Sequence, residues 1–342
     1  MQFKIERDRL LKSLSVAHSI IEKKNTIPIL ANVLLEIKDN KLNIVATDLD
    51  IVFRDEISDL KIEQPGSTTT SATVLYDLLR KLPSNHEVTF DLQSQNKLKI
   101  SAQNSKFNLL CLPIDDFPNF GDNFKSEPHE LNSKKLLLLL NKTRISMSND
   151  DTRHYLNGIF IHPTASNKNS YLTGVATDTH RLSSSSTSIK ESSNFKPFIL
   201  PKKTVFQLCN LLQESDEKIH LYIGEGKIQF KIGNSAIVSK VIDGKFPEYE
   251  KVVPKNNNKI LSVNVKDFIN SIERVITVSI DRKEGVKITL EKDQIQLFVA
   301  STTSGEGKET LKANYNSETL TISFNARYLL DIASEIQDEK LT

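Results

Sequence analysis

The sequence has few cysteines, little net charge and no long apolar run, and each shortage excludes a class of protein. Cys111 and Cys209 are the only two cysteines in 342 residues, and they stand 98 positions apart without a Cys or His at ligand spacing. A disulfide framework and a zinc module are therefore excluded, as suits a reducing cytoplasm. The formal net charge of +2 excludes a polybasic nucleic-acid-binding protein, so contact with nucleic acid depends on local clusters of charge.

Membrane and secretion signals are also lacking. The longest apolar run, Leu136–Leu140, has five residues, whereas a membrane span needs about 20. The first ten residues, MQFKIERDRL, alternate and carry charge, so they do not form a secretory signal. We predict a soluble cytoplasmic protein that has no membrane partner.

Motifs that carry chemistry are missing as well. The sequence contains no P-loop, HExxH, GxSxG or paired-cysteine motif, and GEG at 224–226 and 305–307 predicts hairpin or loop turns. The nearest candidate is TDTHR at 177–181, where Asp178 and His180 could join an acid–base or metal site. The matching phrase ATD at 46–48 has no His, which favours an Asp that caps a strand-end turn. We predict no catalytic residue, no metal and no cofactor.

The chain repeats three phrases in the same order, which indicates three copies of one unit. The strand-and-turn phrase is IVATD at 44–48, GVATD at 174–178 and FVAST at 298–302. Successive copies are 130 and 124 residues apart, measured from Ala46 to Ala176 and to Ala300. The other two phrases are helices, predicted at Asp8–Ile21, Ser133–Ile145 and Lys266–Ile276 for the first and at Val74–Leu82, Lys203–Leu212 and Ala326–Ile336 for the second.

Between the helices, apolar residues alternate with polar ones, as in half-buried strands. KDNK at 38–41, GEGK at 224–227 and EKDQ at 291–294 predict hairpin turns. The fold class is α+β, with three similar domains of two helices packed on antiparallel sheets, predicted at 1–121, 129–250 and 256–342. In the first two units the second helix is followed by two more predicted strands. The third unit ends at Thr342 without them, so we expect an exposed sheet edge there.

A helical wheel places a cation opposite the apolar face of every predicted helix. Three of the predicted apolar faces are Val74, Leu75, Leu78 and Leu82 opposite Arg80; Val205, Leu208 and Leu212 opposite Lys203, Gln207 and Asn210; and Leu329, Ile332 and Ile336 opposite Arg327. Solvent-facing Lys and Arg usually serve solubility, and nearby acidic residues such as Asp267 and Asp331 dilute the signal. The recurrence has meaning only if the fold points the six helices at one place. The cations on or beside these faces are Arg9, Lys12, Arg80, Lys135, Lys142, Lys202, Lys203, Lys266, Arg274 and Arg327.

Several phrases in order resemble the bacterial DNA polymerase III beta subunit, the sliding clamp family. They are TIPIL at 26–30, RHYLNG at 153–158, ATDTHRL at 176–182, DGKFPEY at 243–249 and VPK at 253–255. The resemblance implies a homodimeric head-to-tail ring whose helices line a hole for duplex DNA, which makes the helix cations DNA-binding candidates. It adds Lys24, His154 and Tyr155 as loop residues that touch DNA.

The resemblance also implies a pocket for short hydrophobic motifs of the polymerase alpha subunit, the clamp loader and repair polymerases. By matching phrase, its walls are Leu156, Thr177, Thr179, His180, Arg181, Leu182, Pro247 and Val252. Thr179 stands where the family usually has Gly. The family's chain continues past position 342 with an apolar tail, so a chain that ended there would have a weakened third domain and poor partner binding. Dimer contacts are expected between Ile276–Ile280 and Thr73–Leu79 of the other subunit.

Two alternatives remain open. A monomeric, repeat-built protein-interaction module would bind partners without encircling DNA, and substitutions of the helix cations would leave DNA association unchanged. An enzyme acting through Asp178 and His180 would show metal-dependent turnover that is lost in His180→Ala.

Overall fold

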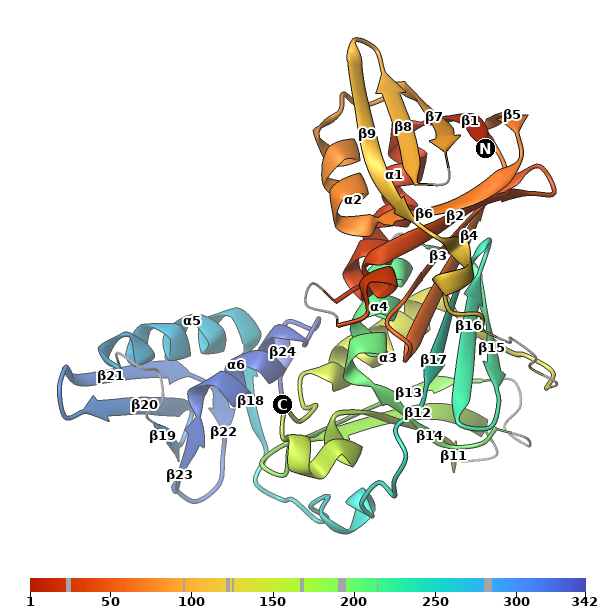
Figure 1. The fold of residues 1–342 in the computed structure, drawn as a ribbon. Helices are drawn as coiled ribbons and strands as arrows, with labels where there is room; N and C mark the ends of the chain where they lie inside the picture. Colours follow the sequence, from red (N-terminus) through yellow and green to blue (C-terminus); the bar gives the residue numbers. More distant parts are fainter. Residues whose placement is uncertain are drawn as a thin grey trace. The chain divides into compact units, whose positions relative to one another are not determined.

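The computed structural model describes residues 1–22, 26–94, 96–120, 124, 126–166, 169–189, 195–213, 215–279 and 285–342. These residues form two compact units, and each is described by itself. Unit 1 comprises 1–176 and 184–245, and unit 2 comprises 177–183 and 246–342 (Figure 1). The predicted limits of three domains stay a prediction.

Six α-helices lie in the described residues, and each agrees with a predicted helix to within two residues at either end. They are α1 (Arg7–Ile20), α2 (Ala72–Lys81), α3 (Ser133–Arg144), α4 (Lys202–Leu212), α5 (Val265–Val275) and α6 (Ala326–Ser334). Four begin at a side-chain cap, in which the oxygen of Ser71, Asn132, Asn264 or Asn325 accepts a backbone N–H of the first turn. Short polar residues at the strand–helix boundaries therefore fix where these helices start.

Unit 1 contains a thirteen-stranded antiparallel sheet in the order β10-β15-β16-β17-β4-β3-β2-β6-β9-β8-β7-β1-β5, and a four-stranded sheet in the order β13-β12-β11-β14. The strands of the first repeat are β1 (Gln2–Glu6), β2 (Asn32–Lys38), β3 (Lys41–Thr47), β4 (Ile51–Ile57), β5 (Lys61–Gln64), β6 (Gly66–Ser71), β7 (Glu87–Ser94), β8 (Lys97–Ala102) and β9 (Ser105–Leu112). Those of the second are β10 (His129–Asn132), β11 (Gly158–Ser166), β12 (Asn169–Thr177), β13 (Leu182–Ser188), β14 (Phe198–Pro201), β15 (Lys218–Ile223), β16 (Lys227–Ile232) and β17 (Ser235–Lys240).

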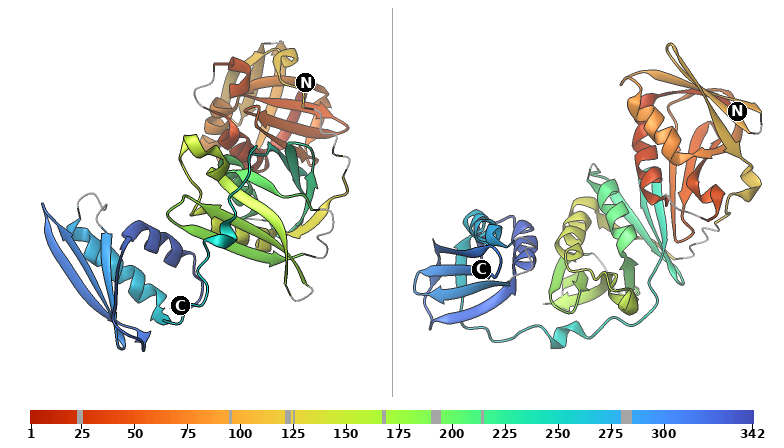
Figure 2. Two further views of the ribbon diagram at one scale, coloured as in Figure 1. Left: turned by 90° about the horizontal axis from the view of Figure 1, so that it is seen from below. Right: turned by 60° about the vertical axis from the view of Figure 1, so that its left-hand side comes forward.

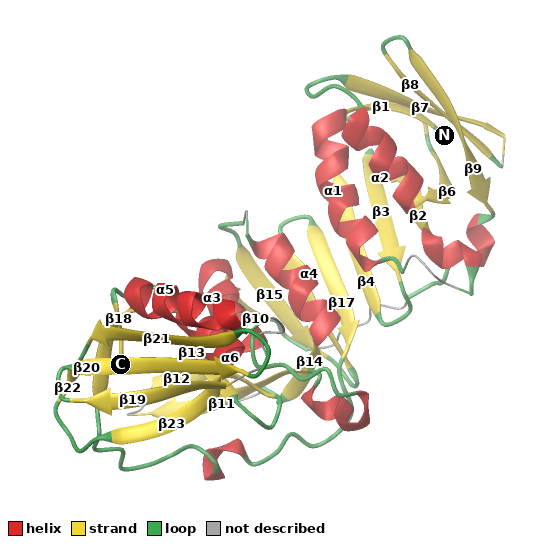
Figure 3. Cartoon of the chain, turned by 90° about the vertical axis from the view of Figure 1, so that its left-hand side faces the viewer, coloured by secondary structure: helices red, strands yellow, loops and turns green. Residues whose placement is uncertain are grey.

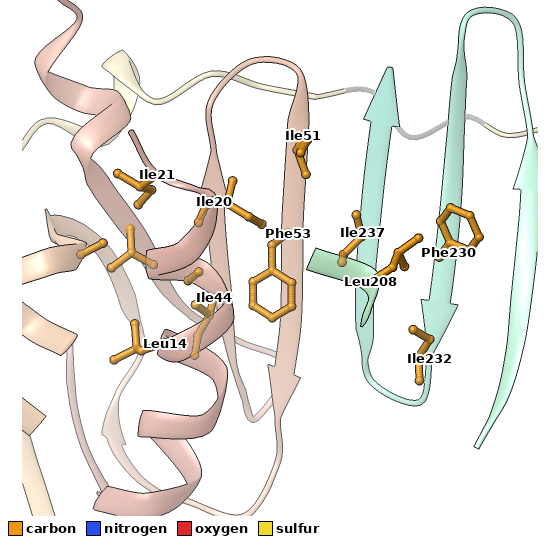
Figure 4. Close-up of a cluster of buried hydrophobic side chains, with 14 of the residues drawn as sticks. Leu14, Ile20, Ile21, Ile44, Ile51, Phe53, Leu208, Phe230, Ile232 and Ile237 are labelled. Carbon is orange, nitrogen blue, oxygen red and sulfur yellow. The ribbon is translucent and has the colours of Figure 1, made fainter. Parts of the chain in front are cut away.

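The first two repeats are joined edge to edge in unit 1. Strand β17 pairs antiparallel with β4, and Phe53 faces Ile237 in that register. Figure 4 shows Phe53 on the side of Ile237 and Leu208, with Phe230 beyond them, and these side chains of both repeats belong to one apolar cluster. Burying one such side chain contributes about 1.5–3 kcal/mol, so the joint is held by a core as well as by a ladder of backbone hydrogen bonds.

The helices cover one face of these sheets in pairs. Helix α1 packs beside α2, and α3 packs beside α4 (Figures 2 and 3). Helix α1 also contacts α4 across the joint, where the Gln207 side-chain amide donates to the Ser19 carbonyl (3.0 Å). Helices from the two repeats therefore lie together on the same side of unit 1.

Unit 2 repeats the order of strand, helix, several strands and second helix of the earlier repeats, and one strand follows its second helix. A four-stranded sheet runs β21-β20-β19-β23, and a small sheet runs β22-β18-β24. Strand β24 pairs with β18 as β7 pairs with β1 and β15 with β10. Three apolar side chains of β23, Leu320, Ile322 and Phe324, are exposed. The strands are β18 (Leu261–Asn264), β19 (Gly285–Glu291), β20 (Gln294–Ser301), β21 (Gly305–Lys312), β22 (Asn314–Tyr315), β23 (Leu320–Asn325) and β24 (Lys340–Leu341).

The three predicted hairpin turns at 38–41, 224–227 and 291–294 are confirmed by the pairing of their flanking strands. The prediction of two strands after each second helix is wrong, because β15, β16 and β17 follow α4 and β7, β8 and β9 follow α2. Gly233, at φ +55°, turns the chain between β16 and β17 and divides what reads as one strand. The predicted turn at 305–307 is also wrong, since these residues begin strand β21 and pair with β20.

Helix faces differ from the predicted faces at three places. Val74, assigned to the apolar face of α2, is 49% exposed, whereas Leu79 is buried. Gln207 was assigned to the solvent face of α4, but it is buried and donates a hydrogen bond to Ser19 of α1. In α6, Ile332 is exposed and Leu329 only half-buried, although both were predicted to face the core.

Within the described part of the chain, no helix combines the length and apolar composition that crossing a membrane requires. The same residues bring together no group of three His, Cys, Asp or Glu side chains that could hold a metal ion.

Candidate DNA interface and partner-binding turn

The predicted cations lie on the helices as expected, but most are already engaged within the chain. Arg9 binds Asp59 (2.6 Å), and Arg80 binds Asp77 (3.2 Å) and lies 5.7 Å from the centre of the Tyr76 ring. Exposed ion pairs contribute about 0–1 kcal/mol each, so phosphate groups can compete for these cations. The pairs weaken the attraction of the helix faces for phosphate without abolishing it.

The same arrangement recurs on α4 and α5. Lys203 binds the buried carboxylate of Asp48 and also Glu22 (3.3 Å). Arg274 Nε donates to Glu309 Oε2 (2.9 Å), and this guanidinium holds the pKa of Glu309 below its usual value. Glu309 therefore stays ionised well below neutral pH and opposes the charge of Arg274.

The remaining cations form fewer contacts. Lys135 donates to the hydroxyl of Ser188 (3.2 Å), and Lys202 donates to the side chain of Asn149. Lys12 is exposed in the first half of α1. Lys142, Lys266 and Arg327 are exposed and form no ion pair with any residue that the structure describes. Lys24 lies outside the described residues.

His154 and Tyr155 lie in the 3-10 segment η3 (Asp151–Leu156), which Asp150 caps at its N-terminus. The carboxylate of Asp150 accepts from the Thr152 hydroxyl (2.6 Å), from the Thr152 backbone N–H (2.9 Å) and from Arg153 Nε (2.8 Å). These donors, the hydroxyl foremost, lower the pKa of Asp150 to about 2. His154 in turn contacts the carbonyl of Asp243 (3.1 Å), so the loop is held at both ends.

The phrase TDTHR forms a tight turn between β12 and β13. Thr177 Oγ1 donates to the Arg181 carbonyl (2.7 Å), and Asp178 Oδ1 accepts the backbone N–H groups of His180 and Arg181 (3.0 Å each). Thr179 has φ +75°, a conformation that favours Gly and is strained for a β-branched residue. The Asp is thus committed to the turn, which confirms its predicted capping role.

Within unit 2 this turn lies against α6. Arg181 Nε donates to Asp178 Oδ2 (3.1 Å), and its NH1 donates to Asp331 Oδ2 (2.7 Å). The guanidinium lies 4.3 Å from the centre of the Tyr328 ring. Sequence reasoning missed Tyr328 and assigned Asp331 only to solvent, because no local pattern relates Arg181 to residues about 150 positions away.

The other predicted pocket residues differ in exposure. Leu182 is half-buried and His180 exposed beside the turn. Pro247 and Val252 flank the single-turn segment η4 (Tyr249–Lys251) in unit 2, and Val252 is 69% exposed. Leu156 is buried in unit 1 at the end of η3. The predicted dimer segment 73–79 lies in α2, whereas Ile280 of the other segment lies outside the described residues.

The fold and these faces define a class of protein, one built from three α+β repeats with cationic helices on one side of each. Three family models match in sequence order: the DNA polymerase III beta subunit N-terminal domain at residues 1–121, its central domain at 130–248 and its C-terminal domain at 250–342. The chain therefore belongs to the DNA polymerase III beta subunit family, and its function is that of a sliding clamp.

Individual relatives agree. The beta sliding clamp of Caulobacter vibrioides is 37% identical over 338 residues, which is 98% of this chain and 91% of the relative. The Bartonella birtlesii sliding clamp, solved with griselimycin bound, has a TM-score of 0.94 at 36% identity and covers 99% of this chain and 91% of its own. The Pseudomonas aeruginosa sliding clamp with griselimycin has a TM-score of 0.91 at 30% identity, with the same coverage.

Proposed function

We propose that two copies of this chain close head to tail into a ring that encircles duplex DNA and slides along it in the cytoplasm. The observation that carries the proposal is the recurrence of cations on all six helices of three similar repeats, where they are exposed on five helices and half-buried on α4. Contacts of cations with phosphate are independent of sequence and weaken with salt, which suits sliding. Retention would come from the closed shape of the ring, so the small net charge of +2 is sufficient.

The ring would tether other proteins through the turn at 177–182 and its neighbours. The proposed pocket residues are Leu156, Thr177, Thr179, His180, Arg181, Leu182, Pro247 and Val252. The set combines apolar side chains with a few polar groups, which is what the capture of an extended hydrophobic motif requires. The polymerase alpha subunit, the clamp loader and repair polymerases are the proposed partners, and the griselimycin-bound relatives support a ligand-binding pocket in this family.

We further propose that the protein is not an enzyme. Asp178 accepts hydrogen bonds from two backbone N–H groups and from Arg181, so its carboxylate is occupied in the turn. His180 is exposed and its backbone N–H donates to Asp178. An acid–base pair would need both side chains free to meet a substrate.

The decisive measurement is retention on nicked circular and on linearised DNA after loading by a bacterial clamp loader and a high-salt wash. We expect the protein to stay on circles and to leave linear DNA through the ends, because salt screens charge but cannot open a closed ring. Equal, salt-sensitive loss from both shapes would contradict encirclement and favour the protein-interaction module. Metal-dependent turnover that is lost in His180→Ala would instead support the enzyme.

A further inference from the structure

The turn at 177–181 has a counterpart in the first repeat with the same internal hydrogen bonds. Thr47 Oγ1 donates to the Ile51 carbonyl (2.8 Å) and accepts from the backbone N–H of Leu49 (2.9 Å). Asp48 Oδ1 accepts from the backbone N–H groups of Asp50 (3.0 Å) and Ile51 (2.7 Å). Leu49 has φ +78°, close to the +75° of Thr179. The two turns are therefore one structural device used twice.

In both turns the second carboxylate oxygen binds a cation. Asp48 Oδ2 binds Lys203, which stands in the first turn of α4, the second helix of the following repeat. Asp178 Oδ2 binds Arg181, which extends to Asp331 in α6, again the second helix of the following repeat. The aspartate of each strand-end turn is thereby linked through a cation to the next repeat.

The third repeat offers an internal contrast. Its corresponding phrase, FVAST at 298–302, has Thr302 where the others have Asp and Ser301 where they have Thr. Ser301 Oγ lies 3.2 Å from Thr303 Oγ1, so hydroxyl groups take part in this turn. The ionic link is a property of the first two turns and is not required for a strand to turn at this place.

We propose that Asp331 is a positioning residue, which holds the 177–182 turn against α6 through Arg181 and so sets the shape of the partner-binding pocket. This inference rests on the proposed pocket. Three observations carry it: the 2.7 Å ion pair, the placement of the guanidinium 4.3 Å from the centre of the Tyr328 ring, and the low exposure of the Arg181 side chain (14%). A pair this sheltered is screened less by solvent than a surface pair.

The geometry gives Asp331 a role distinct from Asp178. Asp178 fixes the turn internally, because among the described residues its hydrogen-bond donors all belong to that turn. Asp331 lies in α6 outside the turn, and its one ion pair with a residue that the structure describes is the one with NH1 of Arg181. Loss of the Asp331 charge therefore leaves the turn folded but frees it, with its strained Thr179, from α6.

The test compares Asp331→Asn with the unaltered full chain by titration calorimetry with griselimycin, the compound that two relatives bind. We expect a roughly tenfold weaker Kd, equivalent to about 1.4 kcal/mol, and several-fold faster hydrogen exchange at the amides of His180 and Arg181. Asp331→Glu restores the charge and should recover most of the affinity. The melting temperature should change little in either variant.

The matched control is Glu318→Gln. Glu318 pairs with Lys259 (3.4 Å) in the same unit, but its side chain is 89% exposed. This variant removes the same charge and should alter neither griselimycin binding nor exchange at the turn. If Asp331→Asn lowers the melting temperature, hydrogen exchange is measured in Tyr328→Leu instead. The Leu variant removes the ring that contacts the guanidinium and keeps the charges of Arg181 and Asp331.

Unchanged exchange at the turn in both Asp331→Asn and Tyr328→Leu would overturn the proposed positioning role. Unchanged griselimycin affinity in a well-folded Asp331→Asn would overturn its connection to the pocket. A wild-type protein that fails to bind griselimycin would count against the proposed pocket itself. In that case the exchange measurement still decides whether Asp331 holds the turn.

Discussion

At the scale of single residues, charged side chains in this protein are less available than the sequence predicts. Arg9, Arg80, Lys203 and Arg274 each bind a carboxylate of the same chain. The helix wheel places these cations correctly but cannot supply the partners of Lys203 and Arg274, since Asp48 and Glu309 come from a turn and a strand distant in sequence. Such pairs are consistent with a DNA interface that binds weakly and moves.

One residue-scale prediction concerns Asp150, whose pKa of about 2 lies below the ordinary value of 3.8 for an aspartate. A carboxyl group with a lowered folded-state pKa stabilises the folded loop fully above its unfolded value. That contribution is lost as pH falls from about 4 toward 2. Thr152→Val removes the largest cause, the hydroxyl hydrogen bond, so the Asp150 pKa should rise toward 3.8 in a carboxyl-detected NMR titration.

Thr152→Ser is the control for this titration, because it keeps the hydroxyl group that donates to Asp150. Its Asp150 pKa should stay near 2. Equal Asp150 pKa values in the Val and Ser variants would show that the hydroxyl is not the main cause.

At the scale of elements, the sequence was sufficient for the helices and for most strands. Apolar periodicity and polar caps are local signals: all six helices follow the first, and four of them begin at a polar cap. The buried faces of the helices were predicted less accurately, because burial depends on neighbours from other repeats. Gln207 is an example, since it is buried where α4 contacts α1 of the preceding repeat. The turn at 177–181 was predicted from its sequence, whereas its attachment to α6 depends on residues that no local pattern connects.

An element-scale prediction concerns Gly158, the first residue of β11, which faces Pro201 of β14. A Cβ added there would lie 2.2 Å from the backbone oxygen of Leu200, so the two strands must separate. Overpacking of this kind costs about 1–3 kcal/mol, and Gly158→Ala should lower the melting temperature by several degrees in calorimetry.

Gly285 provides a matched control, because it begins β19 as Gly158 begins β11 and faces Asn325 of β23 in the same way. A Cβ at Gly285 would lie 3.5 Å from the backbone oxygen of Phe324, an ordinary contact. Gly285→Ala should therefore leave the melting temperature nearly unchanged. Similar losses for both substitutions would indicate that close approach at Gly158 is not the reason.

At the scale of the whole molecule, the cations on the helices indicate a function only because they recur in three similar repeats. A cation on one surface helix has no meaning by itself, since solubility explains it. Three similar repeats in a sliding clamp family place such cations on every helix. The function was therefore accessible from the order of repeated phrases, and not from any single residue or motif.

Charge and topology make separate contributions to this function, and substitutions can separate them. Lys142, Lys266 and Arg327 are exposed on helices. Lys97, Lys231 and Lys287 are exposed on strands, and each of these three lysines lies in a different repeat. Replacing the three helix cations with Ala should weaken loose DNA binding and reduce its salt dependence. Each lost phosphate contact lowers the slope of log K against log salt by about 0.9.

The same helix variant should remain on nicked circles after a high-salt wash as well as the wild type does, because a closed ring needs no charge to stay threaded. The strand variant, in which Lys97, Lys231 and Lys287 are replaced with Ala, removes an equal charge from the sheets and not from the helices proposed to line the hole, so it should change neither measurement. If the helix variant lost retention on circles, charge would hold the protein on DNA in place of the ring. If the strand variant weakened DNA binding equally, net charge would matter and the placement of the helix cations would not.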